Sequence, residues 1–234
     1  MLKFLRRFVA ALLAPSLAAT TAVAEGRWQQ VENKANCVVW NGSPQPNDTV
    51  TWTGGCVGGK GAGSGKMVVR FWNDGDWQES SYTGTLQNGK PHDHGVWVGA
   101  NGNRYEGGWE DGTLAGYGVF VEANGDRYEG EYKDSKPHGK GVWILADGGK
   151  YDGDWQIGNW HGRGVFVDAD GNRYEGEYKD GKRHGRGNFI LANGSNCEGD
   201  WYEDELLESG KGWNANEDRI MTCYFDGTGM KFSD

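Results

Sequence analysis

The sequence predicts an all-β protein built from tandem β-hairpins, and two observations carry this prediction. The chain is rich in both glycine and aromatic residues, with 41 Gly, 12 Trp, 10 Tyr and 8 Phe among 234 residues. Both kinds of residue recur with a period of 23 residues, which is typical of a repeat architecture. We therefore expect an elongated, single-layer, twisted antiparallel sheet of 23-residue hairpins with disulfide-pinned ends. Collagen would need Gly at every third position, and a disordered Gly-rich chain would lack the aromatic residues.

The repeats divide the chain into four parts. Residues 1–24 have the pattern of a signal peptide, and residues 25–81 form an N-terminal cap with a degenerate repeat. Residues 82–196 are five repeats, and residues 197–234 are a degenerate sixth repeat with a C-terminal cap. The repeats begin at Tyr82, Tyr105, Tyr128, Tyr151, Tyr174 and, for the sixth, Cys197.

The first five residues of each repeat alternate with period two, which indicates a strand. The odd positions carry an aromatic residue, Gly and a second aromatic residue, whereas the even positions carry mostly Asp or Glu. Because Gly has no Cβ atom, it leaves space for a neighbouring ring, and ring pairs add about 0.5 to 1.5 kcal/mol each. We expect an uncovered aromatic face, which we call the aromatic ladder, with Tyr105, Trp109, Tyr128, Tyr132, Tyr151, Trp155, Tyr174 and Tyr178.

A second strand follows in each repeat and carries Gly and, two residues later, a large aromatic residue such as Trp143 or Phe166. Turns with Gly separate the two strands. Asn-Gly or Asp-Gly steps, such as Asn101-Gly102, lead to the next repeat. These steps are the strongest local signals for a hairpin.

The segment before the repeats has its own strand signals. We expect strands at Cys37–Asn41 and Thr49–Thr53 that pair as a disulfide-pinned hairpin over the first edge of the array. The segment Gly54–Lys60 fits G-x-x-x-x-G-K, but Gly61 stands where a phosphate-binding loop needs Ser or Thr, and no helix pattern follows. This segment therefore predicts turns and tight packing.

The N-terminus predicts export. Lys3, Arg6 and Arg7 precede an apolar run, and small residues lead to an expected cleavage site after Ala24. An uncleaved membrane anchor is the alternative, but polar residues interrupt the run. Cleavage would remove three basic residues and change the net charge from −9 to about −12. This charge disfavours nucleic acid and anionic membranes as partners, and we expect a periplasmic or secreted protein.

Four cysteines in an exported chain suggest two disulfides, for which three pairings are possible. Spacing favours Cys37 with Cys56 and Cys197 with Cys223, one pair at each end of the array. Each disulfide would close a loop of roughly 20 to 25 residues and contribute about 3 kcal/mol in the chain-entropy model. Metal ligation is the alternative, but the sequence has no C-x-x-C pair. We expect neither a metal nor a cofactor.

Neither the histidines nor the acidic columns predict catalysis. Adjacent repeats place equivalent residues about 10 Å apart, too far for shared zinc ligation with bonds of about 2 Å. We therefore expect the histidines to anchor turns. The Asp and Glu residues at the even strand positions suggest the carboxylate pair of a glycosidase, but a solvated strand face is the simpler interpretation. We therefore expect no enzyme activity. Four histidines share one repeat position: His92, His138, His161 and His184.

The motif Y-E-G-E-Y-K-D-G-K-x-H-G-x-G at Tyr174–Gly187, with a near-copy at Tyr128–Gly141, resembles the MORN (membrane occupation and recognition nexus) repeat. The resemblance covers residues 82–219 and implies an elongated meander of hairpins. The segment Cys37–Cys56 looks like the leader of exported bacterial MORN proteins. The chain departs from the motif at Ala115 in the histidine column, at Asp93-His94 in place of a His-Gly step, and at Ser135 in place of a turn Gly.

We expect a non-enzymatic scaffold that binds a protein, a peptide or its own copy through the aromatic ladder. The resemblance to MORN proteins also implies scaffolding, homodimerisation or membrane attachment, so a membrane-surface or phospholipid-binding module is the second hypothesis. An accessory subunit of an enzyme is the third, because MORN arrays precede lipid-kinase or methyltransferase domains in some proteins. Roughly 15 residues follow the last repeat, too few for a catalytic domain.

Overall fold

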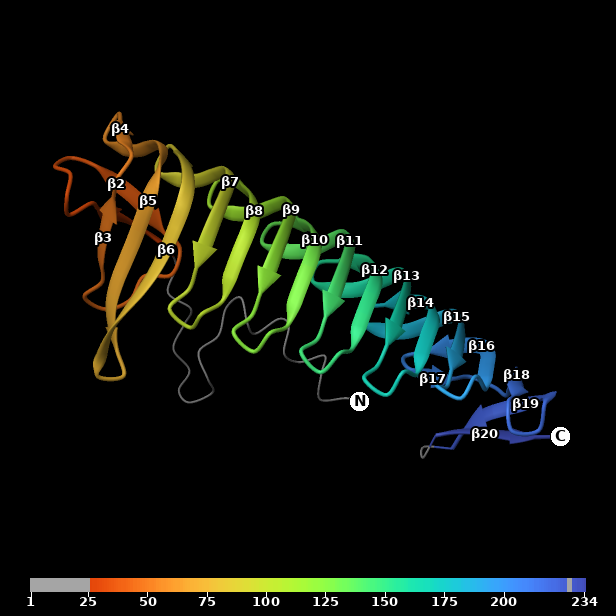
Figure 1. Cartoon of the computed structure of the whole chain (residues 1–234). Helices are drawn as coiled ribbons and strands as arrows, with labels where there is room; N and C mark the ends of the chain where they lie inside the picture. Colours follow the sequence, from red (N-terminus) through yellow and green to blue (C-terminus); the bar gives the residue numbers. More distant parts are fainter. Residues whose placement is uncertain (1–25, 227–228) are drawn as a thin grey trace. The chain divides into compact units, whose positions relative to one another are not determined.

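The computed structural model describes residues 26–226 and 229–234 (Figure 1). This part of the chain consists of strands, turns and irregular segments; no helix occurs in it, and hence no helix long and apolar enough to cross a membrane. The predicted all-β fold of tandem hairpins is confirmed. The predicted signal peptide, residues 1–24, lies outside the described residues.

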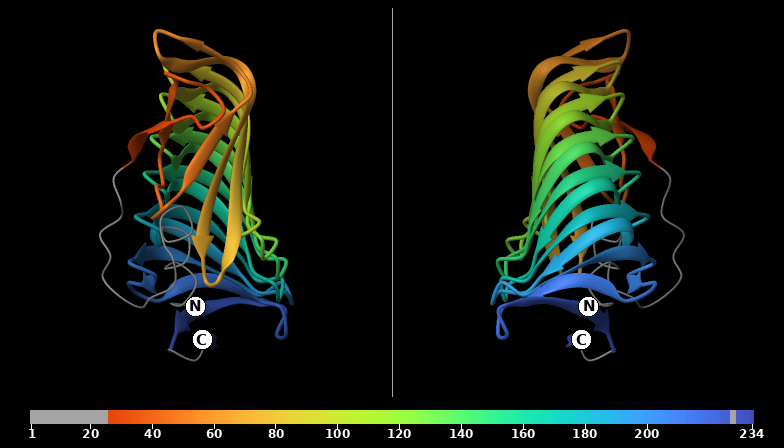
Figure 2. Two further views of the ribbon diagram at one scale, coloured as in Figure 1. Left: turned by 90° about the vertical axis from the view of Figure 1, so that its left-hand side faces the viewer. Right: turned by 90° about the vertical axis from the view of Figure 1, so that its right-hand side faces the viewer.

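The chain forms two compact units. The N-terminal unit comprises residues 26–124 and 131–136, and the C-terminal unit comprises residues 125–130 and the described residues from Pro137 onward. Strand β10 (Arg127–Lys133) has residues in both units. Within each unit, successive hairpins pair with their neighbours in an open, mostly antiparallel sheet, and the strands curve in the same sense (Figure 2).

Each repeat forms one hairpin in the register that its period predicts. In the fourth repeat the facing pairs are Tyr151 with Phe166, Gly153 with Gly164, and Trp155 with Trp160. Cross-strand partners point to the same side of a sheet, so the aromatic residues and the glycines of both strands share one face. The remaining strands of the repeat region are β6 (Asp76–Gln87), β7 (Lys90–Val98), β8 (Arg104–Glu110), β9 (Thr113–Val121), β11 (Lys136–Ile144), β12 (Lys150–Gln156), β13 (Asn159–Val167), β14 (Arg173–Lys179), β15 (Lys182–Ile190) and β16 (Asn196–Tyr202).

The two turns of a repeat differ in backbone geometry. The turn inside a repeat has two central residues with positive φ, such as Asp180 (φ 52°) and Gly181 (φ 84°). This geometry is the type I′ turn, which matches the twist of the strands that it joins. The turn between repeats has one residue with positive φ, such as Gly171 (φ 85°), whose N–H donates to the Asp168 carbonyl at 3.0 Å.

The N-terminal cap differs from the predicted hairpin. Strand β2 (Val38–Asn41) pairs with β1 (Arg27–Gln30), whereas β3 (Thr49–Trp52) pairs with β5 (Lys60–Asn73). The expectation that β2 and β3 pair with each other is therefore wrong. The reason is the buried Asp48 carboxylate in the loop between them, which accepts hydrogen bonds from Gln29 of β1 at 2.9 Å and from Asn41 of β2 at 2.7 Å.

The core of the N-terminal unit lies under this cap. Strand β4 (Gly55–Val57) pairs with the start of β5, and the long hairpin β5–β6 extends past its neighbours (Figure 1). Its tip carries Trp72 and Trp77, two exposed rings in an edge-to-face pair at 5.5 Å. The buried core residues are Val31, Cys37, Val39, Val50, Trp52, Met67, Val69, Tyr82 and Leu86.

The sixth repeat ends the C-terminal unit. Its second strand is present in two pieces, β17 (Glu205–Leu206) and β18 (Gly210–Asn214). Strand β19 (Arg219–Phe225) pairs with β18 and also with β20 (Met230–Ser233), which the sequence did not predict.

Both predicted disulfides are confirmed. Cys37 is bonded to Cys56 in the N-terminal cap, and Cys197 is bonded to Cys223 in the C-terminal cap.

Candidate functional site

The tyrosine that opens each repeat lies over two glycines of the same repeat. A Cβ atom added to Gly187 would lie 2.1 Å from the Tyr174 hydroxyl oxygen, and one added to Gly176 would lie 2.6 Å from it. The same overlap occurs in the other four repeats. The predicted role of Gly as a space for a ring is confirmed, but the ring over the third-position Gly comes from its own strand, and the predicted ring from a neighbouring strand is found only over the Gly of the second strand. The Tyr151 hydroxyl donates to the Asp154 carbonyl at 2.9 Å, which fixes the ring in its place.

The rings join consecutive repeats edge to face. The opening Tyr of one repeat contacts the fifth residue of the next, with interplanar angles between 80° and 90°. Such pairs are a favourable arrangement of aromatic quadrupoles. They are Tyr82 with Trp109 at 5.3 Å, Tyr105 with Tyr132 at 5.3 Å, Tyr128 with Trp155 at 5.0 Å, Tyr151 with Tyr178 at 5.3 Å, and Tyr174 with Trp201 at 5.3 Å.

Where the fifth residue is Trp, its indole also bonds the preceding repeat. The Nε1–H of Trp155 donates to the Gly141 carbonyl at 3.0 Å, and that of Trp201 donates to the Gly187 carbonyl at 3.2 Å. A ring contact and a hydrogen bond therefore connect these neighbouring repeats at one residue.

The structure buries most of the predicted binding residues. Seven of the eight side chains of the aromatic ladder are at most 4% exposed, and Trp109 is half-buried. The expectation of an uncovered face is therefore wrong for these seven rings, because the opening Tyr of one repeat and the fifth residue of the next cover each other. Burial raises the pKa of Tyr82 to about 12. It also raises the pKa of Tyr105, Tyr151, Tyr174 and Tyr178.

Other rings remain partly accessible on the same face of the C-terminal unit. Trp160, Phe166 and Phe189 are half-buried. Trp160 stacks flat on Tyr151, with a centroid distance of 4.2 Å and an interplanar angle of 6°, and it lies 5.2 Å from Phe166. Phe189, in the next repeat, lies 5.4 Å from Phe225. We use the name exposed aromatic cluster for Trp160, Phe166 and Phe189, which belong to two consecutive repeats.

The sequence contained a signal for this cluster. Trp160 stands at the tenth position of its repeat, where the first three repeats have Pro91, Leu114 and Pro137. The fifth repeat has Arg183 there, whose guanidinium lies 4.3 Å from the Trp201 ring and pairs with Asp204 at 3.3 Å. The change from Pro or Leu to Trp and Arg distinguishes the fourth and fifth repeats from the first three on this face.

The opposite face carries rows of charged residues. In four repeats a basic residue pairs with the acidic residue two positions later on the same strand, as in Lys150 with Asp152 at 3.1 Å. The pKa of Glu106 is lowered by its hydrogen bond from Arg104. These exposed pairs contribute little stability, and they agree with the predicted solvated face.

Two histidines lie close to turns. The backbone N–H of Asp111 donates to His92 Nδ1 at 3.4 Å, and His161 Nδ1 lies 3.9 Å from Asp180, in the equivalent turn of a later repeat. The predicted role in turn anchoring is confirmed for His92. Among the described residues, no three His, Cys, Asp or Glu side chains come together as a metal site requires.

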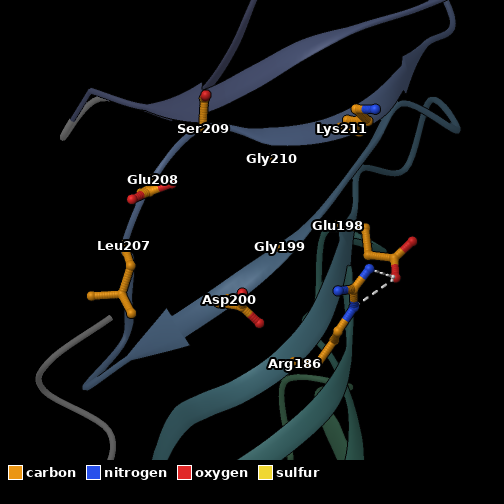
Figure 3. Close-up of a pocket in the computed structure, with 9 residues that line it drawn as sticks. All are labelled: Arg186, Glu198, Gly199, Asp200, Leu207, Glu208, Ser209, Gly210 and Lys211. Atoms are coloured by element: carbon orange, nitrogen blue, oxygen red, sulfur yellow. Dashed lines mark hydrogen bonds and ion pairs between the residues drawn. The ribbon is translucent and has the colours of Figure 1, made fainter.

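A surface depression of about 470 Å³ lies on the charged side of the C-terminal unit, between β16 and β18 (Figure 3). Arg186 donates to Glu198 at 3.0 and 3.1 Å, so two of its charged groups already neutralise each other (Figure 3). The lining residues are Arg186, Glu198, Gly199, Asp200, Leu207, Glu208, Ser209, Gly210 and Lys211.

Comparison with protein-family models decides the nature of the hairpin array. The MORN repeat model matches five consecutive segments, residues 82–104, 105–127, 128–150, 151–173 and 174–196. Residues 82–196 are five MORN repeats. No curated protein matches the chain in a sequence search.

MORN repeats are often involved in protein or membrane interactions. The boundaries of the five matched MORN repeats coincide with the residues at which the sequence period places them. Just under half of the chain is matched, and the two disulfide-bearing ends lie outside the matched repeats.

The departures from the MORN motif have local explanations. Ser135 (φ 60°) occupies a turn position that Gly fills elsewhere, and its hydroxyl accepts the Leu114 N–H at 3.0 Å. Pro, the residue at the position of Leu114 in two other repeats, has no N–H that needs this partner. Asp93 (φ 57°) tolerates the left-handed region better than most residues. Nothing in the structure explains Ile157 (φ 51°), a β-branched residue that is 61% exposed in a turn.

Proposed function

We propose that this chain is a non-enzymatic, exported scaffold that binds a protein or peptide, or a second copy of itself, through the aromatic face of its C-terminal unit. The observation that carries the proposal is Trp160. Its large ring replaces the Pro of the neighbouring repeat, stacks on the buried Tyr151 and stays half-accessible. Aromatic side chains held in this way are typical anchors of protein interfaces.

The aromatic ladder has a supporting role in this proposal. Its buried rings hold Trp160, Phe166 and Phe189 in fixed positions, so a partner loses little side-chain entropy in the scaffold when it binds. Ile157 lies in the turn that joins the strands of the same hairpin and adds an exposed apolar side chain at its end. The chemistry that fits this surface is an apolar or aromatic segment of a protein.

Export is part of the proposal. The sequence of residues 1–24 has the pattern of a signal peptide, and two disulfides are compatible with an oxidising compartment.

The test is affinity capture from the native compartment with the wild-type chain and the Trp160→Pro variant. Pro fits this position because the Pro137 carbonyl accepts the N–H of Gly158, in the turn of the next repeat, at 2.9 Å, just as the Trp160 carbonyl accepts the N–H of Gly181 at 2.9 Å. We expect the variant to fold and to lose the captured partner. Undiminished capture by the folded variant would exclude the exposed aromatic cluster as the binding site.

A membrane-surface function is the second candidate, and one observation favours it. Trp72 and Trp77 lie half-exposed at the tip of the projecting hairpin β5–β6, and Trp favours the membrane interface. Asp74 and Asp76 in the same tip oppose binding to anionic lipids. Flotation with zwitterionic and anionic vesicles tests this candidate: co-flotation at physiological salt that Trp72→Ser abolishes would favour it over the protein scaffold.

A further inference from the structure

The two disulfides differ in their access to solvent. Cys197 and Cys223 are both 0% exposed in the C-terminal cap. In the N-terminal cap, Cys37 is also 0% exposed, but Cys56 lies in β4, whose three residues are all exposed. A thiolate from solvent can therefore approach the first disulfide from the Cys56 side, whereas protein atoms surround both cysteines of the second.

The exposed disulfide joins Cys37, directly before β2, to Cys56 in β4. The hairpin β1–β2 (residues 27–41), which we call the cap hairpin, meets the hairpin β4–β5 through one parallel bridge, Val38 with Lys60. The Val38 N–H donates to the Gly59 carbonyl at 2.9 Å beside this bridge. The Cys37–Cys56 bond is the covalent link at this junction.

Hydrogen bonds also attach the cap hairpin to the rest of the unit. Asn33 donates to the Trp52 carbonyl at 3.0 Å and accepts the Trp52 N–H at 3.1 Å. The Glu32 N–H donates to the Val50 carbonyl at 2.9 Å, and the Trp40 N–H donates to the Gly89 carbonyl at 2.8 Å. Each such bond contributes about 0.5 to 1.5 kcal/mol. The covalent link adds to these bonds, and it is the attachment that a reductant removes.

The cap hairpin covers apolar surface. Val31 and Val39 pack in the core cluster with Trp52, Tyr82 and Leu86, all of which are at most 1% exposed. Opening of the cap hairpin would expose these side chains at the end of the aromatic face in the N-terminal unit.

We propose that the Cys37–Cys56 disulfide is a latch that a dithiol reductant opens, releasing the cap hairpin and exposing the apolar cluster beneath it. One thiolate of the reductant attacks the Cys56 sulfur, the Cys37–Cys56 bond breaks, and Cys37 leaves as a thiolate that takes up a proton. The second thiol of the reductant, after losing its proton, attacks the mixed disulfide and releases the Cys56 thiolate. Two electrons pass to the cysteine pair, and the reductant becomes a disulfide. The Cys197–Cys223 bond stays intact under the same conditions.

The test uses the wild-type chain, dithiothreitol without denaturant, and quenching with N-ethylmaleimide at successive times. Peptide mass spectrometry reports the labelling of each cysteine. We expect Cys37 and Cys56 to be labelled at least about tenfold faster than Cys197 and Cys223, because the rate of exchange depends on access to the sulfur. Equal rates for the two pairs would overturn the proposal.

Labelling of Cys37 shows whether the cap hairpin opens after the disulfide is reduced. Cys37 is buried, so the maleimide reaches it only when the cap hairpin moves away. Reduction that labels Cys56 and leaves Cys37 unlabelled would show that the cap stays closed, which contradicts the latch. Hydrogen exchange gives a second readout: exchange should rise in residues 27–41 on reduction and stay unchanged in residues 197–225. Both readouts are independent of any partner, so they do not depend on the proposed function.

Discussion

The packing of Tyr rings over glycines can be tested with one pair of matched substitutions. Gly176→Ala and Gly199→Ala change the third residue of the fifth and sixth repeats, and neither glycine has positive φ. At Gly176 the new Cβ would lie 2.6 Å from both the Gly187 Cα and the Tyr174 hydroxyl oxygen. At Gly199, where Cys197 replaces the Tyr, the nearest atom is the flexible end of Leu206 at 2.7 Å.

The expected cost at Gly176 follows from these contacts. Overpacking a rigid site costs about 1 to 3 kcal/mol. Displacement of Tyr174 also weakens its ring pairs with Tyr178 at 5.2 Å and with Trp201 at 5.3 Å, each worth about 0.5 to 1.5 kcal/mol. Replacing Gly restricts the unfolded chain and returns about 0.4 to 1 kcal/mol. We therefore expect Gly176→Ala to destabilise the protein by about 3 kcal/mol.

Thermal unfolding followed by circular dichroism measures the difference. For a chain of this size, about 3 kcal/mol lowers Tm by about 6 to 12 °C, whereas Gly199→Ala should lower it by less than about 3 °C, because Leu206 can change rotamer. Equal Tm values for the two variants would refute the role of the ring over the glycine as the main packing element of the array.

Three further outcomes are expected. Ile157→Asn should raise the free energy of unfolding by about 1 kcal/mol, because Asn tolerates the left-handed backbone that costs a β-branched residue about 1 to 2 kcal/mol; a decrease in urea-melt stability would contradict this. Trp155→Phe should cost about 1 to 3 kcal/mol, since the Gly141 carbonyl loses its donor, whereas Trp72→Phe at the exposed tip should change stability by less than about 0.5 kcal/mol. Stability should be constant up to about pH 10, where tyrosines of the unfolded chain begin to ionise, and should fall as the pH rises towards 12, because the pKa of Tyr82 is about 12 in the folded chain; tyrosinate absorbance and melts across this range check it, and Tyr82→Phe should reduce the fall.

The repeat period predicted much of the fold, because each structural role recurs at a fixed position. The pairing of Gly153 with Gly164 and the ring contacts of Tyr151 follow from positions that recur in five copies. The two disulfides followed from the separation of the cysteines. In the repeats, several copies of the motif predict the same strand register, so the local sequence pattern determines which residues come into contact.

The sequence was less informative where a single contact decides the structure. The buried Asp48 ties the loop before β3 to the β1–β2 pair, and its partners Gln29 and Asn41 lie at no repeated position. The predicted exposure of the aromatic ladder was wrong. The alternation of residue types shows which side chains share a face of the strand, but it does not show how closely the neighbouring hairpins cover that face. Trp160 could have been found as a break in the column of Pro91, Leu114 and Pro137.

The indole hydrogen bonds set a longer unit than the 23-residue period. Trp occupies the fifth position in the second, fourth and sixth repeats, at Trp109, Trp155 and Trp201, and each donates to a Gly carbonyl of the repeat before it. The third and fifth repeats have Tyr132 and Tyr178 there, which have no indole N–H. The indole bonds therefore join the repeats in pairs: the first with the second, the third with the fourth, and the fifth with the sixth. Removal of the 46 residues of the third and fourth repeats keeps Trp109 and Trp201 with their own acceptors, whereas removal of the third repeat alone takes Gly141 away and leaves the equivalent Gly118 before Trp155.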